Sequence, residues 1–246
     1  IARPFQKFFN LNERETFEDI DWNEGHQVYN KLDGSMVHPC LVDGTMFWMT
    51  RKGITDVSQM ASMDIPFEVS DWSRLLLEKG YTPIFEYTSP GNRIVIRYNT
   101  PEVTLLAVRN NVTGEYNQNY MRQAFNLSFL KVPQLFMPIT GKEYIKSVRE
   151  KEESEGVVVA FDSGHRIKIK AELYVMKHRI KSDLTNMKNW LKYVLDGTMD
   201  DLVGLMECED WLDLSEYARK VNKFRMKMFT DIQRIIFEHT GEVDER

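Results

Sequence analysis

The sequence lacks three features that would each define a class of protein: paired cysteines, long apolar runs and an excess of positive charge. Cys40 and Cys208 are the only cysteines in 246 residues, so neither a disulfide framework nor a CxxC zinc knuckle is possible. The longest apolar runs, Val103 to Val108 and Val157 to Phe161, are far too short to cross a bilayer. No signal-peptide pattern is visible, so a reducing, cytoplasmic setting is expected.

The charge balance gives no sign of a nucleic-acid-binding protein. Lys and Arg total 32 against 37 Asp and Glu, a formal net charge of −5. Such binders usually carry a basic excess, but the position of the cations matters more than their sum. The first residue is Ile1 rather than Met, which fits both a processed form and a piece of a longer chain.

Residues 1–180 read as mixed strand and loop with a few helices. Short runs rich in β-branched and aromatic residues, each bounded by turn signals, predict strands. These runs are 26–30, 36–42, 45–49, 82–88, 93–98, 103–108, 156–161 and 166–170. Asp43-Gly44 predicts a tight hairpin turn, and Asp162 to His165 predicts a second turn.

Helical patterns occur at 69–79 and 141–153 and dominate the end of the chain. From about Ser182, apolar residues recur every three or four positions over 182–196, 199–208 and 212–239. We therefore expect an α+β fold, with an antiparallel-rich sheet body over 1–180 and a helical C-terminal region over 181–246.

The sharpest local signal is Lys31-Leu32-Asp33-Gly34-Ser35, which lies between two predicted strands. A lysine at the end of a strand, followed by a turn, is presented rather than packed, and its amine can act as a nucleophile. The plain alternative is a hairpin that carries a solvated lysine, and the string alone does not decide between them.

Charged residues in later strands strengthen the first interpretation. Glu86 lies between aromatic residues, Glu155 opens a strand, and Lys168 and Lys170 are two residues apart. That spacing directs both lysines to one face of a strand, where they could form a wall for phosphates together with Lys31. Taken singly, the acids could be edge charges and the lysines a solvated face.

The series of motifs resembles the covalent nucleotidyltransferases, and most closely the RNA ligase 1 family of T-even-like bacteriophages, the tRNA-repair ligases. The motifs that carry the resemblance are the lead-in Arg3 to Glu13, Lys31 to Ser35, Arg51-Lys52-Gly53, Phe85-Glu86-Tyr87, Pro90 to Val95, Asn111 to Tyr116, Glu155-Gly156, Lys168-Ile169-Lys170 and Asp196 to Leu202. The resemblance implies a nucleotidyltransferase (ATP-grasp-like ligase) sheet body with an appended helical region.

It also implies an ATP-dependent enzyme that joins RNA 5′-phosphate and 3′-hydroxyl ends in three steps. A lysine matched by Lys31 takes AMP from ATP, passes it to an RNA 5′-phosphate, and AMP leaves when a 3′-hydroxyl attacks. The amine must be neutral to attack, a state that Lys168 and Lys170 are expected to favour by repulsion. The implied cofactors are ATP and Mg²⁺, the implied partner is RNA, such as cleaved tRNA, and the implied setting is the cytoplasm of an infected cell.

The same resemblance assigns roles to individual residues. Lys7, Lys52, Lys168 and Lys170 are expected to contact the nucleotide with Lys31, and Glu86 to accept a hydrogen bond from its ribose. Glu155 and Asp200 are expected to hold the metal or its water shell, and Tyr174 matches a functional tyrosine. For Asp200 the alternative is a helix N-cap.

The chain departs from the family pattern at both ends. An arginine that the family places upstream of the lead-in falls before Ile1, and the sequence diverges from Glu207 onward. The alternatives are a DNA ligase or capping enzyme, a non-catalytic RNA-binding module of the same fold, and a structural protein.

Overall fold

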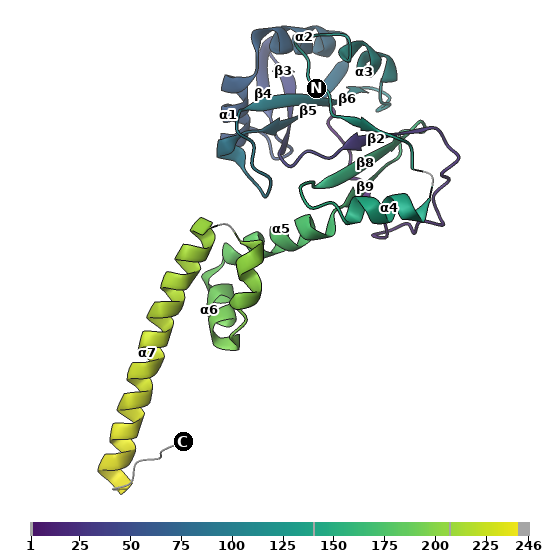
Figure 1. Cartoon of the computed structure of the whole chain (residues 1–246). Helices are drawn as coiled ribbons and strands as arrows, with labels where there is room; N and C mark the ends of the chain where they lie inside the picture. Colours follow the sequence, from purple (N-terminus) through teal and green to yellow (C-terminus); the bar gives the residue numbers. More distant parts are fainter. Residues whose placement is uncertain (1, 140, 207, 241–246) are drawn as a thin grey trace. The chain divides into compact units, whose positions relative to one another are not determined.

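The computed structural model describes residues 2–139, 141–206 and 208–240 (Figure 1). The chain divides between Val175 and Met176 into two compact units. Among the described residues, no helix is both long and apolar enough to cross a membrane.

The first unit contains two sheets. The five-stranded sheet has the order β1-β9-β8-β2-β7, and the pairing is antiparallel except between β1 and β9. Its strands are β1 (Phe9–Asn10), β2 (His26–Asn30), β7 (Leu135–Phe136), β8 (Gly156–Phe161) and β9 (Arg166–Lys170). The predicted turn between β8 and β9 is confirmed, since Gly164 has a φ of +88° and the Phe161 N–H bonds to the His165 carbonyl.

Alternating apolar residues form the buried face of this sheet. Val157, Val159, Ile167 and Ile169 are almost fully buried there. The helix α4 (Lys142–Arg149) adds Ile145 and Val148, which are three residues apart and so lie on one helical face. The helix predicted over 141–153 therefore forms, but it ends at Arg149.

The four-stranded antiparallel sheet has the order β4-β3-β5-β6. Its strands are β3 (Ser35–Val42), β4 (Thr45–Met49), β5 (Tyr81–Thr88) and β6 (Glu102–Asn110). The Asp43-Gly44 hairpin forms as predicted, with φ values of +48° and +75° at its two turn residues.

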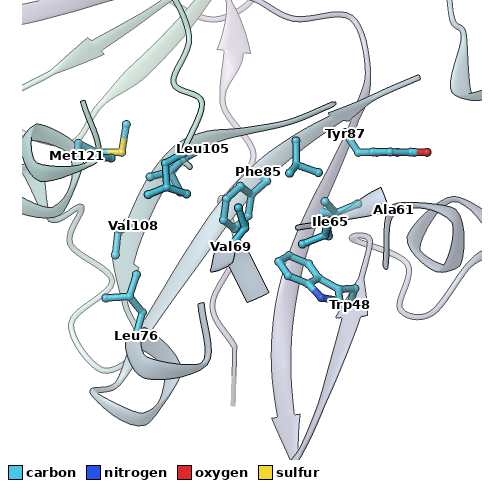
Figure 2. Close-up of a cluster of buried hydrophobic side chains, with 14 residues drawn as sticks. Trp48, Ala61, Ile65, Val69, Leu76, Phe85, Tyr87, Leu105, Val108 and Met121 are labelled. Atoms are coloured by element: carbon cyan, nitrogen blue, oxygen red, sulfur yellow. The ribbon is translucent and has the colours of Figure 1, made fainter. Parts of the chain in front are cut away.

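Helices α1 (Asp56–Asp64), α2 (Phe67–Glu78) and α3 (Gln118–Ala124) supply the second core with the four-stranded sheet. Figure 2 shows Phe85 near the middle of this cluster, with Trp48 and Leu105 on either side. The Trp48 and Phe85 rings meet edge to face at 5.6 Å. The predicted helix over 69–79 corresponds to α2, which Gly80 follows at a φ of +81°.

The strand predicted over 93–98 is wrong, because these residues form a loop after the short helix η1 (Pro90–Asn92). The N–H groups of Val95 and Ile96 donate to the Asp33 carboxylate at 2.7 and 2.6 Å. A buried side chain thus takes the backbone donors that a sheet ladder would have used.

The C-terminal helices begin with α5 (Glu172–Leu184), which starts before Ser182 and spans the boundary between the units. It is followed by α6 (Met187–Asp196), the short helix η2 (Asp200–Leu205) and α7 (Cys208–Thr240). Leu214 and Ala218 of α7 pack with Val194 and Leu202 in a third, smaller core.

Candidate functional site

A cavity of about 740 Å³ lies between the two sheets of the first unit. Tyr29, Val158 and Lys168 line it from the five-stranded sheet, and Met36 and Glu86 from the four-stranded sheet. Its volume falls in the range of pockets for small molecules and cofactors.

The cavity is strongly cationic although the chain is acidic overall. Seven of its lining residues are cations, namely Lys7, Lys31, Arg51, Lys52, Arg166, Lys168 and Lys170. Among the described lining residues, Glu86 alone is acidic. The structure therefore brings together all six residues that the sequence pointed to for nucleotide contact, in surroundings that suit an anion with several charges.

Lys31 lies where the chain passes from one sheet to the other. The strand β2 ends at Asn30, and β3 begins at Ser35 in the other sheet. The Lys31 N–H bonds to the Gly156 carbonyl at 3.0 Å, which fixes the start of its side chain beside β8. The hairpin alternative is wrong, since residues 31–34 connect different sheets and the Lys31 side chain is only 19% exposed.

Glu155 holds two lysines through one oxygen atom. Its Oε1 lies 2.7 Å from Lys31 Nζ and 2.9 Å from Lys170 Nζ. The Glu155 side chain is 3% exposed, so the interpretation of this acid as an edge charge is wrong. A buried carboxylate requires partners of this kind, and the two ammonium groups supply them.

Gly156 makes this contact possible. Its φ is +132°, and a Cβ atom there would lie 2.0 Å from the Ile169 carbonyl oxygen. A larger residue would push β8 and β9 apart at the point where Glu155 meets Lys170. The Glu155-Gly156 motif thus pairs the acid with the one residue type that allows the close approach.

Glu86 lies in β5 and reaches the cavity from the other side. Burial raises the pKa of Glu86 to about 8, against the positive charge of Lys31, which lowers it. Near neutral pH its carboxyl group is therefore largely protonated, which lets it donate as well as accept a hydrogen bond.

Lys168 of β9, Lys7 and Lys52 have different surroundings at the cavity. Burial lowers the pKa of Lys168, and the charges of Lys31 and Lys170 lower it further. Lys7 lies over the Phe9 ring at 4.7 Å. Lys52 is exposed in the turn from Thr50 to Gly53, whose ends exchange two backbone hydrogen bonds.

Two polar residues support the turn that follows Lys31. Asp33 is 1% exposed, and its second oxygen, Oδ1, accepts the Tyr174 hydroxyl at 2.6 Å. Burial raises the pKa of Tyr174, and Lys170 Nζ lies 5.0 Å from the centre of its ring. Sequence reasoning treated Asp33 as a turn residue and missed this role, because its partners are distant in sequence.

The described residues contain no ready-made cluster of metal ligands. No group of three or more His, Cys, Asp or Glu side chains among them could hold a metal ion. Glu155 is engaged by two lysines, and Asp200 lies in the second unit, exposed in the first turn of η2. The N-cap alternative for Asp200 is wrong, since Met199 is the N-cap residue of η2.

Two sheets that enclose a lysine, a buried acid and a cationic wall match the nucleotidyltransferase fold, and comparisons with solved structures agree on it. An archaeal ATP-dependent RNA ligase aligns over 70% of this chain and 49% of its own, with 18% identity and a TM-score of 0.54. A Naegleria gruberi RNA ligase variant, solved with ATP and Mn, aligns over 64% of this chain and 53% of its own, with 15% identity and a TM-score of 0.52.

The sequence itself places the chain more narrowly. A family model described as RNA ligase matches residues 1–184, and the chain belongs to this RNA ligase family. A predicted RNA ligase of Thermovibrio ammonificans is 31% identical over 244 residues, which cover 94% of this chain and 62% of the relative. A predicted bifunctional polynucleotide kinase/RNA ligase of Autographa californica nuclear polyhedrosis virus is 26% identical, over 83% of this chain and 32% of the relative. The chain thus spans less than two thirds of the length of these relatives.

Proposed function

We propose that the chain is an ATP-dependent RNA ligase in which Lys31 carries AMP as a covalent intermediate. The observation that carries the proposal is the position of the Lys31 amine in a cavity with six further cations and one protonatable acid. A nucleoside triphosphate is an anion of the size and charge that such a cavity suits. Membership of the RNA ligase family supports the same assignment.

In the first step the Lys31 Nζ lone pair forms a bond to the α-phosphorus of ATP. The bond from that phosphorus to the bridging oxygen breaks, and pyrophosphate leaves with the electron pair. The Lys31 ammonium first passes one proton to Glu155, 2.7 Å away, which frees the lone pair. The second proton, released as the phosphoramidate forms, leaves with the pyrophosphate. Lys168 and Lys170 stabilise the negative charge that develops on the transferred phosphoryl group.

The remaining residues position the nucleotide. Glu86 contacts the ribose from β5, and its raised pKa lets it serve as donor or acceptor there. Lys7 and Lys52 meet phosphate oxygens from the segments before β2 and after β4. Magnesium would accompany ATP as its counter-ion, and no step is assigned to it.

The second and third steps act on RNA. AMP passes from Lys31 to a 5′-phosphate end, and a 3′-hydroxyl then attacks that phosphorus, which joins the ends and releases AMP. We place the activity in tRNA repair, in the branch of the family typified by T-even-like bacteriophages. A cleaved anticodon stem-loop should then be sealed faster than two unrelated linear strands.

The first test is intact-protein mass spectrometry after incubation with ATP and Mg²⁺. The unmodified chain should gain the mass of one AMP, while GTP should give no adduct. Lys31→Ala and Lys31→Arg should both lack the adduct, and Lys79→Ala, a change at an exposed lysine outside the cavity, should keep it. An adduct on Lys31→Ala would place the nucleophile elsewhere. No adduct on the unmodified chain, with RNA still bound, would favour a non-catalytic RNA-binding module.

A further inference from the structure

A second cavity, of about 200 Å³, adjoins the first within the same unit. The two share four lining residues, Gln6, Lys7, Phe8 and Arg166. Phe9, Arg14, Glu15, Tyr116, Gly164 and His165 complete the smaller cavity. The roles proposed above for ATP use none of these six.

Two arginines flank Tyr116 and differ in how their charge is satisfied. Arg109 donates to the carbonyls of Gly114 and Pro4 at 2.7 and 2.5 Å, so its guanidinium anchors the N-terminal segment. Arg166 lies 4.2 Å from the Tyr116 ring centre and is 7% exposed. Its Nε has no hydrogen-bond partner, and no carboxylate in the described part of the chain forms an ion pair with it.

Burial lowers the pKa of Arg166, and the Tyr116 hydroxyl, which hydrogen-bonds with its guanidinium, offsets only part of that effect. A buried polar group whose hydrogen bonds are incomplete is a candidate contact for a ligand. Because Arg166 lines both cavities, the missing anion belongs at the point where they meet.

Aromatic rings and further cations surround this point. The Arg14 guanidinium is exposed and lies 3.9 Å from the Phe9 ring centre. A groove that alternates cations with aromatic rings is the usual way to bind single-stranded nucleic acid, since phosphates meet the cations and bases stack on the rings.

One acid in the smaller cavity favours an RNA phosphodiester over a nucleoside triphosphate as the bound anion. Glu15 lines the smaller cavity and pairs with His165 at 3.3 Å. Its carboxylate opposes a compact triphosphate more strongly than a phosphodiester, which carries a single negative charge. The volume, below the usual range for whole ligands, also suits one backbone phosphate and part of its nucleoside.

We propose that the smaller cavity binds the RNA strand beside its reacting end, with a backbone phosphate on Arg166 and Arg14 and the adjoining nucleoside against Phe9 and Tyr116. The proposal rests on the proposed function, which places that end in the larger cavity. It makes Arg14 a contact for RNA and not for ATP.

The test measures RNA binding separately from nucleotide chemistry. Arg14→Gln should weaken binding of a short 5′-phosphorylated oligoribonucleotide about fivefold by fluorescence anisotropy, and Arg14→Lys should recover most of the loss. The slope of log affinity against log salt should fall by about 0.7, the value for one phosphate contact in a single strand. Self-adenylylation by Arg14→Gln should be unchanged. The control Arg122→Gln removes an exposed cation of α3 that lines neither cavity, and it should change neither RNA affinity nor the salt slope.

Arg166→Met tests the proposal with two measurements, the melting temperature and the affinity for RNA, which a purely structural role of Arg166 would change in the opposite way. Loss of a buried charge that no carboxylate pairs with, replaced by an apolar side chain that can still pack against Tyr116, should leave the melting temperature equal or higher, while RNA affinity falls. A lower melting temperature with unchanged RNA affinity would overturn the proposal, as would unchanged affinity and salt slope in Arg14→Gln. A raised KM for ATP in Arg14→Gln would assign the cavity to the triphosphate instead. Anisotropy measures RNA binding without any reaction. If the unmodified chain fails to self-adenylylate, the ligase proposal is therefore refuted, while the RNA-binding proposal is still tested by its own measurement.

Discussion

The Tyr174 hydroxyl donates a 2.6 Å hydrogen bond to Asp33, 141 residues away in the sequence. The bond joins the start of α5 to the turn after Lys31. Asp33 also accepts two N–H groups from the loop at Val95 and Ile96, so one buried carboxylate connects three segments of the chain.

Tyr174→Phe should therefore lower the free energy of unfolding by about 1–3 kcal/mol, because a buried carboxylate oxygen loses its donor. It should also slow self-adenylylation, since the turn that carries Lys31 loses a support. Urea denaturation measures the first effect and the rate of AMP attachment the second. The matched control is Tyr193→Phe, which removes a hydroxyl bond to Asp183 in the second unit and should leave the rate unchanged.

Gly156→Ala should lower the free energy of unfolding by at least about 2 kcal/mol, because the position combines a positive φ with a close approach to the Ile169 carbonyl. Gly204→Ala is the matched control, since no described atom lies within 4 Å of its Cβ position and its φ is ordinary. Thermal unfolding should separate the two variants clearly. Equal melting temperatures would show that β8 and β9 tolerate a side chain at this point.

Glu86 predicts a pH dependence of stability. Its folded pKa of about 8 lies above the ordinary value of 4.5, so the native state holds a proton that the unfolded state releases. Stability from this group is complete below about pH 4.5 and is lost as the pH rises towards about 8. Glu86→Gln keeps the neutral form and should flatten this decline. Melting temperatures of both proteins across that window test it, and parallel curves would contradict the assignment.

The two lysines on Glu155 should act together rather than additively. Lys31→Ala and Lys170→Ala each leave Glu155 one ammonium partner, whereas the double variant leaves the buried carboxylate without either. A double-mutant cycle on the free energy of unfolding should therefore give a coupling energy of about 1–3 kcal/mol between the two lysines. Glu155→Gln in the double variant should restore much of the loss. Simple additivity would mean that water replaces the lysines at little cost.

The sequence predicted the local elements well where turn chemistry and periodicity agreed, as at Asp43-Gly44 and in α2. It failed at 93–98, where β-branched residues suggest a strand but the Asp33 carboxylate takes the backbone donors. Side-chain competition for N–H groups cannot be seen in a local pattern.

For the candidate site, residue patterns singled out Lys31, Glu86, Lys168 and Lys170, the resemblance to the ligase family added Lys7 and Lys52, and all six line one cavity. Arg166 was missed. In sequence it is an ordinary charged residue in a strand, and its unusual state, a buried guanidinium without a counter-charge, exists only once Phe5 and Tyr116 pack against it.

The crossing of the chain from one sheet to the other at Lys31 separates two tasks within a single cavity. The β9 lysines, which we assign to phosphate, belong to one sheet, while Glu86 and Met36 belong to the other. Substitutions beside Glu86 in β5 can therefore change the contact with the ribose without altering the lysines of β9. Redesign for a different nucleotide donor would therefore change residues of β5 and keep those of β9.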